Sequence, residues 1–242
     1  MTNMPSAADG RNSEHFDTRS KKGRGLDGLP RGYFGAILAD PTWEFRTWSA
    51  RGRGRSAERH YRSTLTLDEI KALPVSEIAA PDCVLFLWAT WPCLFAALDV
   101  IAAWGFNYKT VGYVFIKQTK RGNGLHWGTG YWTRANSEPC LLATRGKPKR
   151  LHADVHQVII EPRREHSRKP DCTRERIERL VAGPYLELFA RSERPGWTAW
   201  GDELDKFEPE YDAKDDFSKS LEEGYRAIRR RVAAGGPKWV PK

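Results

Sequence analysis

Short apolar runs, rich in β-branched and aromatic residues, recur along the chain between polar connections. Each run has the length of a buried strand, and turn-forming residues separate most of them. The pattern therefore predicts strands over residues 35–39, 83–89, 108–117, 140–144, 155–160 and 185–190.

Helical patterns lie between several of these runs. Residues 67–73 are opened by a capping box of Thr66 and Glu69, residues 94–104 follow Pro92, and residues 174–181 follow Pro170. Strands that alternate with helices predict an α/β fold with a mostly parallel sheet and helices on both faces. Such sheets bind ligands beyond the carboxyl ends of their strands, where the strand order reverses, so functional residues are expected there.

The two ends of the chain differ from this middle part. Residues 1–30 mix polar and basic residues without apolar periodicity and are predicted to form a mobile arm. One domain is expected over residues 31–206, followed by a tail, 207–242. An amphipathic helix is predicted over about residues 217–234 of that tail. Its apolar stripe consists of Phe217, Leu221, Tyr225, Ile228 and Val232, and whether it packs on its own domain or on a partner is left open.

Charge narrows the class of partner. The formal net charge is +9 and the isoelectric point about 9.5, which favours a polyanion. Basic residues cluster at 51–62, 147–150 and 163–169, each time after a predicted strand. No run of eighteen apolar residues is present, so we expect a cytoplasmic protein without a membrane span. The four cysteines lie far apart, and we predict no metal site and no disulfide framework.

The segment Asp40-Pro41-Thr42-Trp43 follows the first predicted strand directly. It brings a carboxylate, a backbone carbonyl and an aromatic ring to a carboxyl strand end, a set that suits methylation of the adenine N6 amine. The carboxylate and the carbonyl can accept the two N–H bonds and turn the nitrogen lone pair toward a methyl donor. Trp43 can stack on the extruded base. The alternative interpretation is an Asp-Pro turn with Trp43 packed in the core.

Further segments, in order along residues 33–205, resemble the MT-A70 family of adenine-N6 methyltransferases. Asp40-Pro41-Thr42-Trp43 is close to that family's Asp-Pro-Pro-Trp. The other matching segments are Arg59-His60-Tyr61, Thr66–Ile70, Leu85–Thr90, Trp104-Gly105-Phe106, Gly128–Glu138, Ser167–Asp171, Ile177–Leu180, Glu187–Arg191 and Trp197–Glu203. Their common order makes the resemblance specific.

The resemblance implies a Rossmann-like fold in permuted motif order, with S-adenosyl-L-methionine as cofactor. Asp40, Pro41 and Trp43 would be catalytic. By the same resemblance the cofactor would be bound by Asp40, Lys169, Phe189, Arg191, Asp202 and Glu203, and the substrate by Tyr61, Trp132, Asn136 and Glu138. Lys can neutralise a carboxylate and acidic side chains can accept from ribose hydroxyls, which agrees with these roles. For Trp132, packing at the sheet edge remains the alternative.

A basic loop next to the expected active site completes the substrate surface. Arg51, Arg53 and Arg55 alternate with small residues, and we predict that they contact phosphates. Nucleic acid is therefore the expected partner. DNA is favoured over RNA because the chain resembles compact bacterial or phage members of the family. The protein is expected to be a monomer or homodimer, with a partner subunit left open.

Thr42 stands where the family has a second proline. Threonine relaxes the backbone restriction that proline imposes, and a displacement of the acceptors by about an ångström costs about a hundredfold in rate. Two functions remain open: an active or weakly active methyltransferase, or a silent nucleic-acid-binding subunit that supports a partner enzyme.

Overall fold

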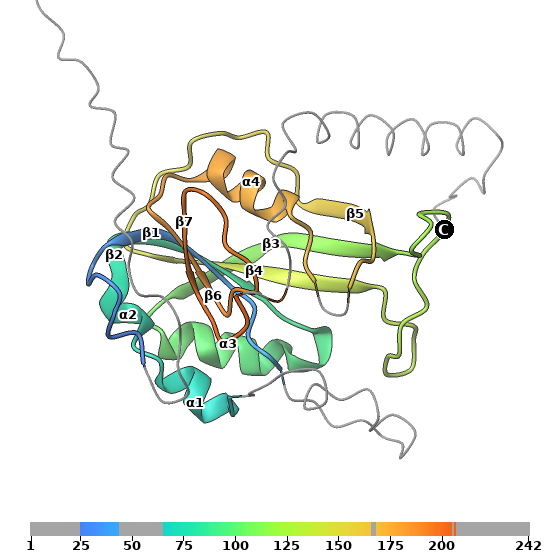
Figure 1. The fold of residues 1–242 in the computed structure, drawn as a ribbon, viewed down its shortest axis with the longest axis horizontal. Coiled ribbons are helices and arrows are strands. Elements are labelled where there is room, and N and C mark those ends of the chain that lie inside the picture. Colours follow the sequence, from blue (N-terminus) through green and yellow to red (C-terminus); the bar gives the residue numbers. More distant parts are fainter. Residues whose placement is uncertain (1–24, 44–64, 166–167, 205, 207–242) are drawn as a thin grey trace, which may run out of the picture.

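A computed structural model describes residues 25–43, 65–165, 168–204 and 206. Within these residues, seven strands form one sheet in the order β5-β3-β4-β2-β1-β6-β7 (Figure 1). The strands are β1 Phe34–Ala39, β2 Ala79–Trp88, β3 Asn107–Gln118, β4 Ser137–Arg145, β5 Val158–Pro162, β6 Tyr185–Leu188 and β7 Trp197–Trp200. The order places β1 near the middle of the sheet, between β2 and β6.

The sheet is mostly parallel, as predicted. β1 pairs in parallel with β2 and β6, β6 with β7, and β3 with β5, whereas β4 is antiparallel to both of its neighbours. Because β4 alone is reversed, the other six described strands end at the same edge of the sheet. The chain leaves β1 toward β2 on one side and later returns to β6 on the other. The carboxyl end of β1 is therefore the switch point at which such sheets bind ligands.

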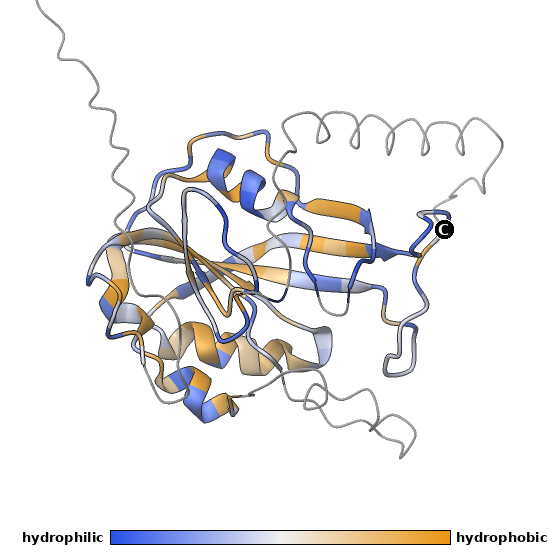
Figure 2. Cartoon of the chain, viewed as in Figure 1, coloured by the Kyte–Doolittle hydropathy of each residue, from blue (hydrophilic) through white to orange (hydrophobic). Residues whose placement is uncertain are grey.

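Helices cover both faces of the sheet, again as predicted. The helices α1 Leu67–Ala72, α2 Val75–Ile78 and α3 Leu94–Ala103 lie on one face, and α4 Cys172–Leu180 lies on the other (Figures 1 and 2). Alternate residues of β2 enter different cores: Leu85 and Leu87 pack with α1 and α3, whereas Val84 and Phe86 pack with Ile177 of α4. The predicted capping box of Thr66 and Glu69 is present at the start of α1.

Some predicted boundaries were wrong. β5 begins three residues later than expected and runs on to Pro162, which pairs with Gln118 at the end of β3. β6 stops at Leu188 because Phe189 has a φ of 62°, outside the extended region. The short strand β7 was not predicted at all, since four residues carry too little alternation to be recognised.

The boundary of the N-terminal arm also needs correction. Leu26 and Leu29 fall inside the predicted arm, 1–30, yet both are buried in the core that holds α1 and α3. The packed part of the chain therefore begins no later than Leu26. The remainder of the predicted arm, the basic loop with Arg51, Arg53 and Arg55, Tyr61, and the tail helix 217–234 lie outside the described residues.

Candidate active site

Asp40 is positioned by β1, whose residues are almost all buried because the strand lies between two neighbours and under helices on both faces. The Asp40 amide donates to the Leu188 carbonyl of β6 at 3.4 Å, which holds the residue at the carboxyl end of the strand. Pro41 follows and is buried, and Thr42 is half-buried. The side chain of Asp40 lines a pocket at this end of the sheet.

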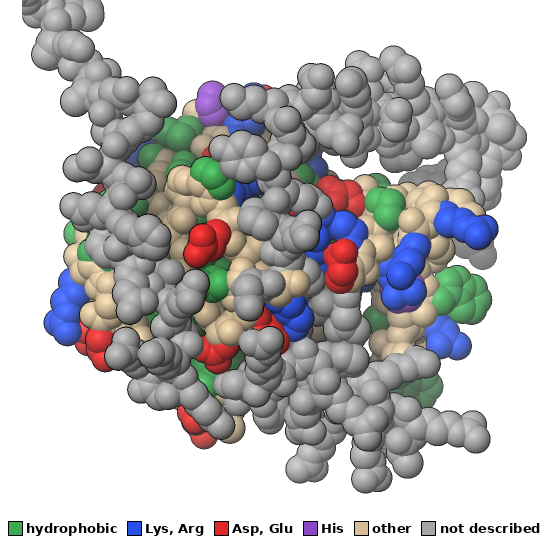
Figure 3. All heavy atoms as spheres, viewed as in Figure 1, with side chains coloured by type: hydrophobic (Ala, Val, Ile, Leu, Met, Phe, Trp, Pro, Cys, Tyr) green, Lys and Arg blue, Asp and Glu red, His purple; other side chains and the backbone are tan. Residues whose placement is uncertain are grey.

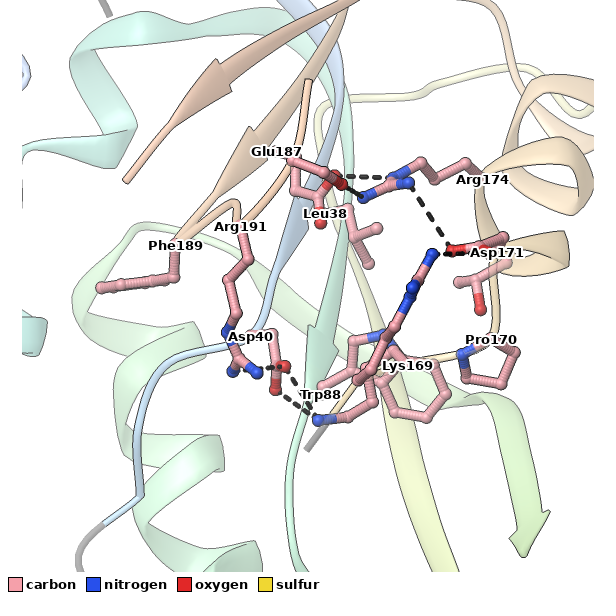
Figure 4. A pocket seen from close by; sticks show the side chains of 13 residues that line it. Leu38, Asp40, Trp88, Lys169, Pro170, Asp171, Arg174, Glu187, Phe189 and Arg191 are labelled. Carbon is pink, nitrogen blue, oxygen red and sulfur yellow. Dashed lines mark hydrogen bonds and ion pairs between the residues drawn. The ribbon is translucent and has the colours of Figure 1, made fainter. Parts of the chain in front are cut away.

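Two basic residues surround the Asp40 carboxylate (Figure 4). The Lys169 Nζ donates to both oxygens, at 2.7 and 2.8 Å, and Arg191 Nη2 donates to Oδ2 at 3.2 Å. All three side chains are at most 15% exposed. Lys169 lies 129 residues from Asp40 in the sequence, just before α4, while Arg191 follows β6. Residues from the beginning and the end of the domain thus form one charged cluster, in agreement with the permuted order implied by the resemblance.

Glu138 extends this cluster toward β3. It forms an ion pair with Lys117 at the end of β3, and its Oε2 lies 3.6 Å from Lys169 Nζ. Burial alone would raise the pKa of Glu138, but the neighbouring Lys169 and Lys117 outweigh it and lower this pKa. Burial likewise opposes the charge of Lys169, and Asp40 and Glu138 together raise its pKa. Both groups are therefore charged at neutral pH.

A second ion pair lines the other side of the pocket. Arg174 of α4 donates to Glu187 of β6 at 2.7 Å, and burial raises the pKa of Glu187 despite this partner. Figure 4 shows the pair beside Asp171, which also faces the pocket. Glu187 and Asp171 lie in segments that resemble the MT-A70 family, but neither residue was assigned a role from the sequence. The available signal was a lone carboxylate within the apolar run of residues 185–190.

Phe189 forms part of the pocket wall immediately after β6. Its φ of 62° is unusual for an aromatic residue, and its ring packs edge-on against Trp200 with centroids 5.6 Å apart. Gly201 permits this approach: a Cβ there would lie 2.3 Å from the Ala190 carbonyl oxygen. The turn that carries Phe189 and Arg191 into the pocket therefore depends on a residue without a side chain.

The remaining predicted site residues lie apart from the pocket lining. Trp43 is only 8% exposed, packs in the core and donates from Nε1 to the Trp88 carbonyl at 2.8 Å, so stacking on a base stays a prediction. The Asn136 carbonyl accepts from the Lys117 amide. Trp132 is fully exposed. Asp202 is exposed after β7, and Glu203 beside it pairs with Lys206.

No helix in the described ranges is long and apolar enough to cross a membrane. The same part of the chain holds no group of three or more His, Cys, Asp or Glu side chains arranged to bind a metal ion.

Comparison with known proteins agrees with the geometry of the site. The MT-A70 family matches residues 34–203, a range that contains β1, Asp40 and every other described pocket residue. Among similar proteins, the Type II methyltransferase M.MunI of Mycoplasma sp is 32% identical over 193 residues, which are 73% of this chain and 80% of that protein. The N(6)-adenosine-methyltransferase MT-A70-like protein of Drosophila melanogaster is 30% identical over 187 residues, or 75% of this chain and 29% of its own.

A human relative gives the same result. The N(6)-adenosine-methyltransferase catalytic subunit METTL3 of Homo sapiens is 29% identical over 187 residues, 75% of this chain. The chain spans about 30% of that much longer protein, so the shared part is the domain that contains the pocket. The family match covers most of this chain, and the order of the strands and the charged cluster at Asp40 agree with it. The chain therefore belongs to the MT-A70 family.

Proposed function

We propose that the chain transfers the methyl group of S-adenosyl-L-methionine to the N6 amine of adenine in DNA. The observation that carries this proposal is the Asp40 carboxylate at the switch point of the sheet, held by Lys169 and Arg191 in a pocket. The relatives named as N(6)-adenosine-methyltransferases support N6 of adenine as the atom that accepts the methyl group. DNA is chosen because the Type II methyltransferase M.MunI matches the chain over most of its own length.

The lining of the pocket fits the proposed cofactor. S-adenosyl-L-methionine carries an ammonium, a carboxylate and ribose hydroxyls, and it supplies a methyl group on a positively charged sulfur. Lys169, Arg168 and Arg191 offer positive charge, and Asp171 and Glu187 offer acceptors. The indole N–H of Trp88, which also lines the pocket, is buried and has no hydrogen-bond partner among the described residues. These groups are a donor and acceptor set for a zwitterionic ligand.

Asp40 keeps room for a substrate N–H. A carboxylate accepts about four hydrogen bonds, and Lys169 and Arg191 supply three. As far as the described residues show, about one acceptor position therefore stays available. In the proposed reaction this position and the Pro41 carbonyl hold the two N6 hydrogens, so that the nitrogen lone pair points at the methyl group. Lys169 and Arg191 fix the orientation of the carboxylate, and Lys169 also meets the cofactor.

The decisive experiment is mass spectrometry of nucleosides after incubation of the protein with cofactor and either DNA or RNA. We expect N6-methyladenine in DNA, and a loss of about a hundredfold or more for Asp40→Asn. Asp99→Asn is the matched control, since Asp99 is an exposed carboxylate on α3. Methylation of RNA alone would overturn the choice of DNA.

Two other results would change the assignment. Equal activity of Asp40→Asn and the unchanged protein would remove Asp40 from the mechanism. No methylation of any nucleic acid, together with weak or no cofactor binding by calorimetry, would favour the silent subunit. In that case Thr42→Pro tests the departure from the family pattern, because a gain of activity would locate the defect at Thr42.

A further inference from the structure

The connection between β3 and β4, residues 119–136, lies on the edge of the sheet that carries Asp40. β3 runs parallel to β1, because β4 is antiparallel to both β2 and β3. The connection therefore begins at the same edge at which β1 ends. In Figure 1 it extends beyond the ends of β3 and β4, away from the helices. A surface on this connection can contact a polymer whose target base occupies the pocket.

This connection carries exposed aromatic rings among positive charges. Trp127 is 77% exposed and Trp132 is fully exposed. The Arg134 guanidinium lies over the Trp127 ring, 5.6 Å from its centroid. Lys120 and Arg121 lie in the same connection, which contains no Asp or Glu between residues 118 and 137. Basic and hydrophobic side chains are accordingly side by side on the lobe at the right of Figure 3.

The connection is folded back on itself. The His126 amide donates to the Lys117 carbonyl and the Lys117 amide donates to the Asn136 carbonyl, both at 2.8 Å, so its two arms flank the end of β3. Gly128 and Gly130 let the arms meet: a Cβ at Gly128 would lie 2.0 Å from the Ala135 carbonyl oxygen. Trp127 and Arg134 are therefore held together by the backbone as well as by their own contact.

The electrostatic surroundings favour an anion. Partial burial, and then the positive charges of Arg163 and Lys117, lower the pKa of His126 next to Trp127. Arg163 follows β5 and thus lies at the same edge of the sheet. A phosphate near this point would be attracted by several basic groups at once.

We propose that Trp127 and Arg134 form a stacking platform for an unpaired nucleotide a few positions away from the target adenine. Exposed aromatic rings beside basic residues bind single strands because every base has a face that can stack, and Arg adds charge and a planar group. An apolar protein partner would gain little from the Lys and Arg side chains, whereas a nucleic acid uses both kinds of group.

The sheet geometry indicates which nucleotide is involved. β1 and β3 are separated by three strand spacings, about 14 Å. At about 3.4 Å per stacked nucleotide, this lateral separation corresponds to about four nucleotide steps, with about three nucleotides between the target base and the platform. The position of the target rests on the proposed function, but binding at the platform does not require methyl transfer.

The test measures binding of fluorescein-labelled single-stranded (dT)12, which contains no adenine, by fluorescence anisotropy. We expect Trp127→Ala to weaken binding about 5-fold to about 150-fold, the range for one stacked base, and Trp127→Phe to remain near the unchanged protein. Tyr108→Ala is the matched control, because Tyr108 is 45% exposed at the opposite end of β3. Comparison of the affinities for (U)12 and (dT)12 shows whether the platform distinguishes RNA from DNA.

Salt dependence separates stacking from charge. Arg134→Gln should reduce the slope of log K against log salt concentration by about 0.7, whereas Trp127→Ala should lower affinity at an unchanged slope. Unchanged binding of (dT)12 by Trp127→Ala, or an equal loss for Tyr108→Ala, would overturn the proposal. If the protein methylates no nucleic acid but the Trp127 effect is found, the proposed function fails and the platform stands. If the protein methylates DNA but Trp127→Ala binds (dT)12 with unchanged affinity, the proposed function stands and the platform fails.

Discussion

Replacement of Lys169 by Met should destabilise the fold, because it leaves the largely buried Asp40 and Glu138 with one basic partner fewer each. Removal of one member of a buried ion pair costs about 3–5 kcal/mol. Here Arg191 still donates to Asp40 and Lys117 still pairs with Glu138, so we expect a smaller loss in the free energy of unfolding, about 2–3 kcal/mol.

A double-mutant cycle isolates the contact between Lys169 and Asp40. Urea unfolding of Lys169→Met, Asp40→Asn and the double variant should give a coupling of about 1–3 kcal/mol, since Lys169 bonds both carboxylate oxygens. The same cycle with Glu138→Gln should give a smaller coupling, because that separation is 3.6 Å. Tryptophan fluorescence can follow unfolding, and Trp88 lies directly beneath the Lys169 ammonium.

A coupling below about 0.5 kcal/mol for the Asp40 cycle, the level expected of independent sites, would contradict a direct contact between Lys169 and Asp40. A larger coupling of Lys169 to Glu138 than to Asp40 would also contradict Asp40 as its main partner. Either result would mean that Lys169 is directed to another partner in solution.

Two further predictions concern pH and packing. The lowered pKa of Glu138 means that its ion pairs stabilise the fold above the ordinary value of 4.5 and that this contribution is lost as pH falls through the lowered pKa. In Glu138→Gln the free energy of unfolding, measured with urea, should therefore fall less steeply as pH is lowered. An unchanged steepness would contradict this. Gly201→Ala should cost about 1–3 kcal/mol, because the new Cβ would meet backbone atoms of Ala190. Gly124→Ala, with nothing within 4 Å of the added Cβ, should stay within about 0.5 kcal/mol, and equal thermal melting of the two variants would disprove the packing argument.

The position of Asp40 was predictable from the sequence because an uninterrupted apolar run ends at a charged residue and a proline. The parallel sheet and the helices on both faces followed from the alternation of strand and helix patterns. The start of β5 was not predictable, since Val155 is apolar without belonging to the strand. The partner of Lys169 was also hidden: the resemblance assigned it to the cofactor, and a contact across 129 residues leaves no local pattern.

The environment of Trp43 shows a second limit. An aromatic residue after a catalytic carboxylate suggests a stacking surface, but its indole donates to the Trp88 carbonyl and its ring lies in the core. Whether an aromatic ring faces a ligand or the core depends on the turn at Pro41 and Thr42, which residue type does not determine. The exposed ring of Trp127 was also missed. A single tryptophan in a mostly polar loop belongs to no hydrophobic pattern, so its exposure could not be predicted.

The central place of β1 has a consequence for synthesis of the protein. β1 leaves the ribosome before any other strand of the described sheet, yet one of its two neighbours, β6, begins only at Tyr185. At about 5–20 residues per second, β1 waits about 7–30 s for that neighbour. During this time the apolar strand has one unpaired edge, which is open to pairing with other nascent chains. The strand that carries Asp40 is thus also the one that most needs protection before the chain is complete.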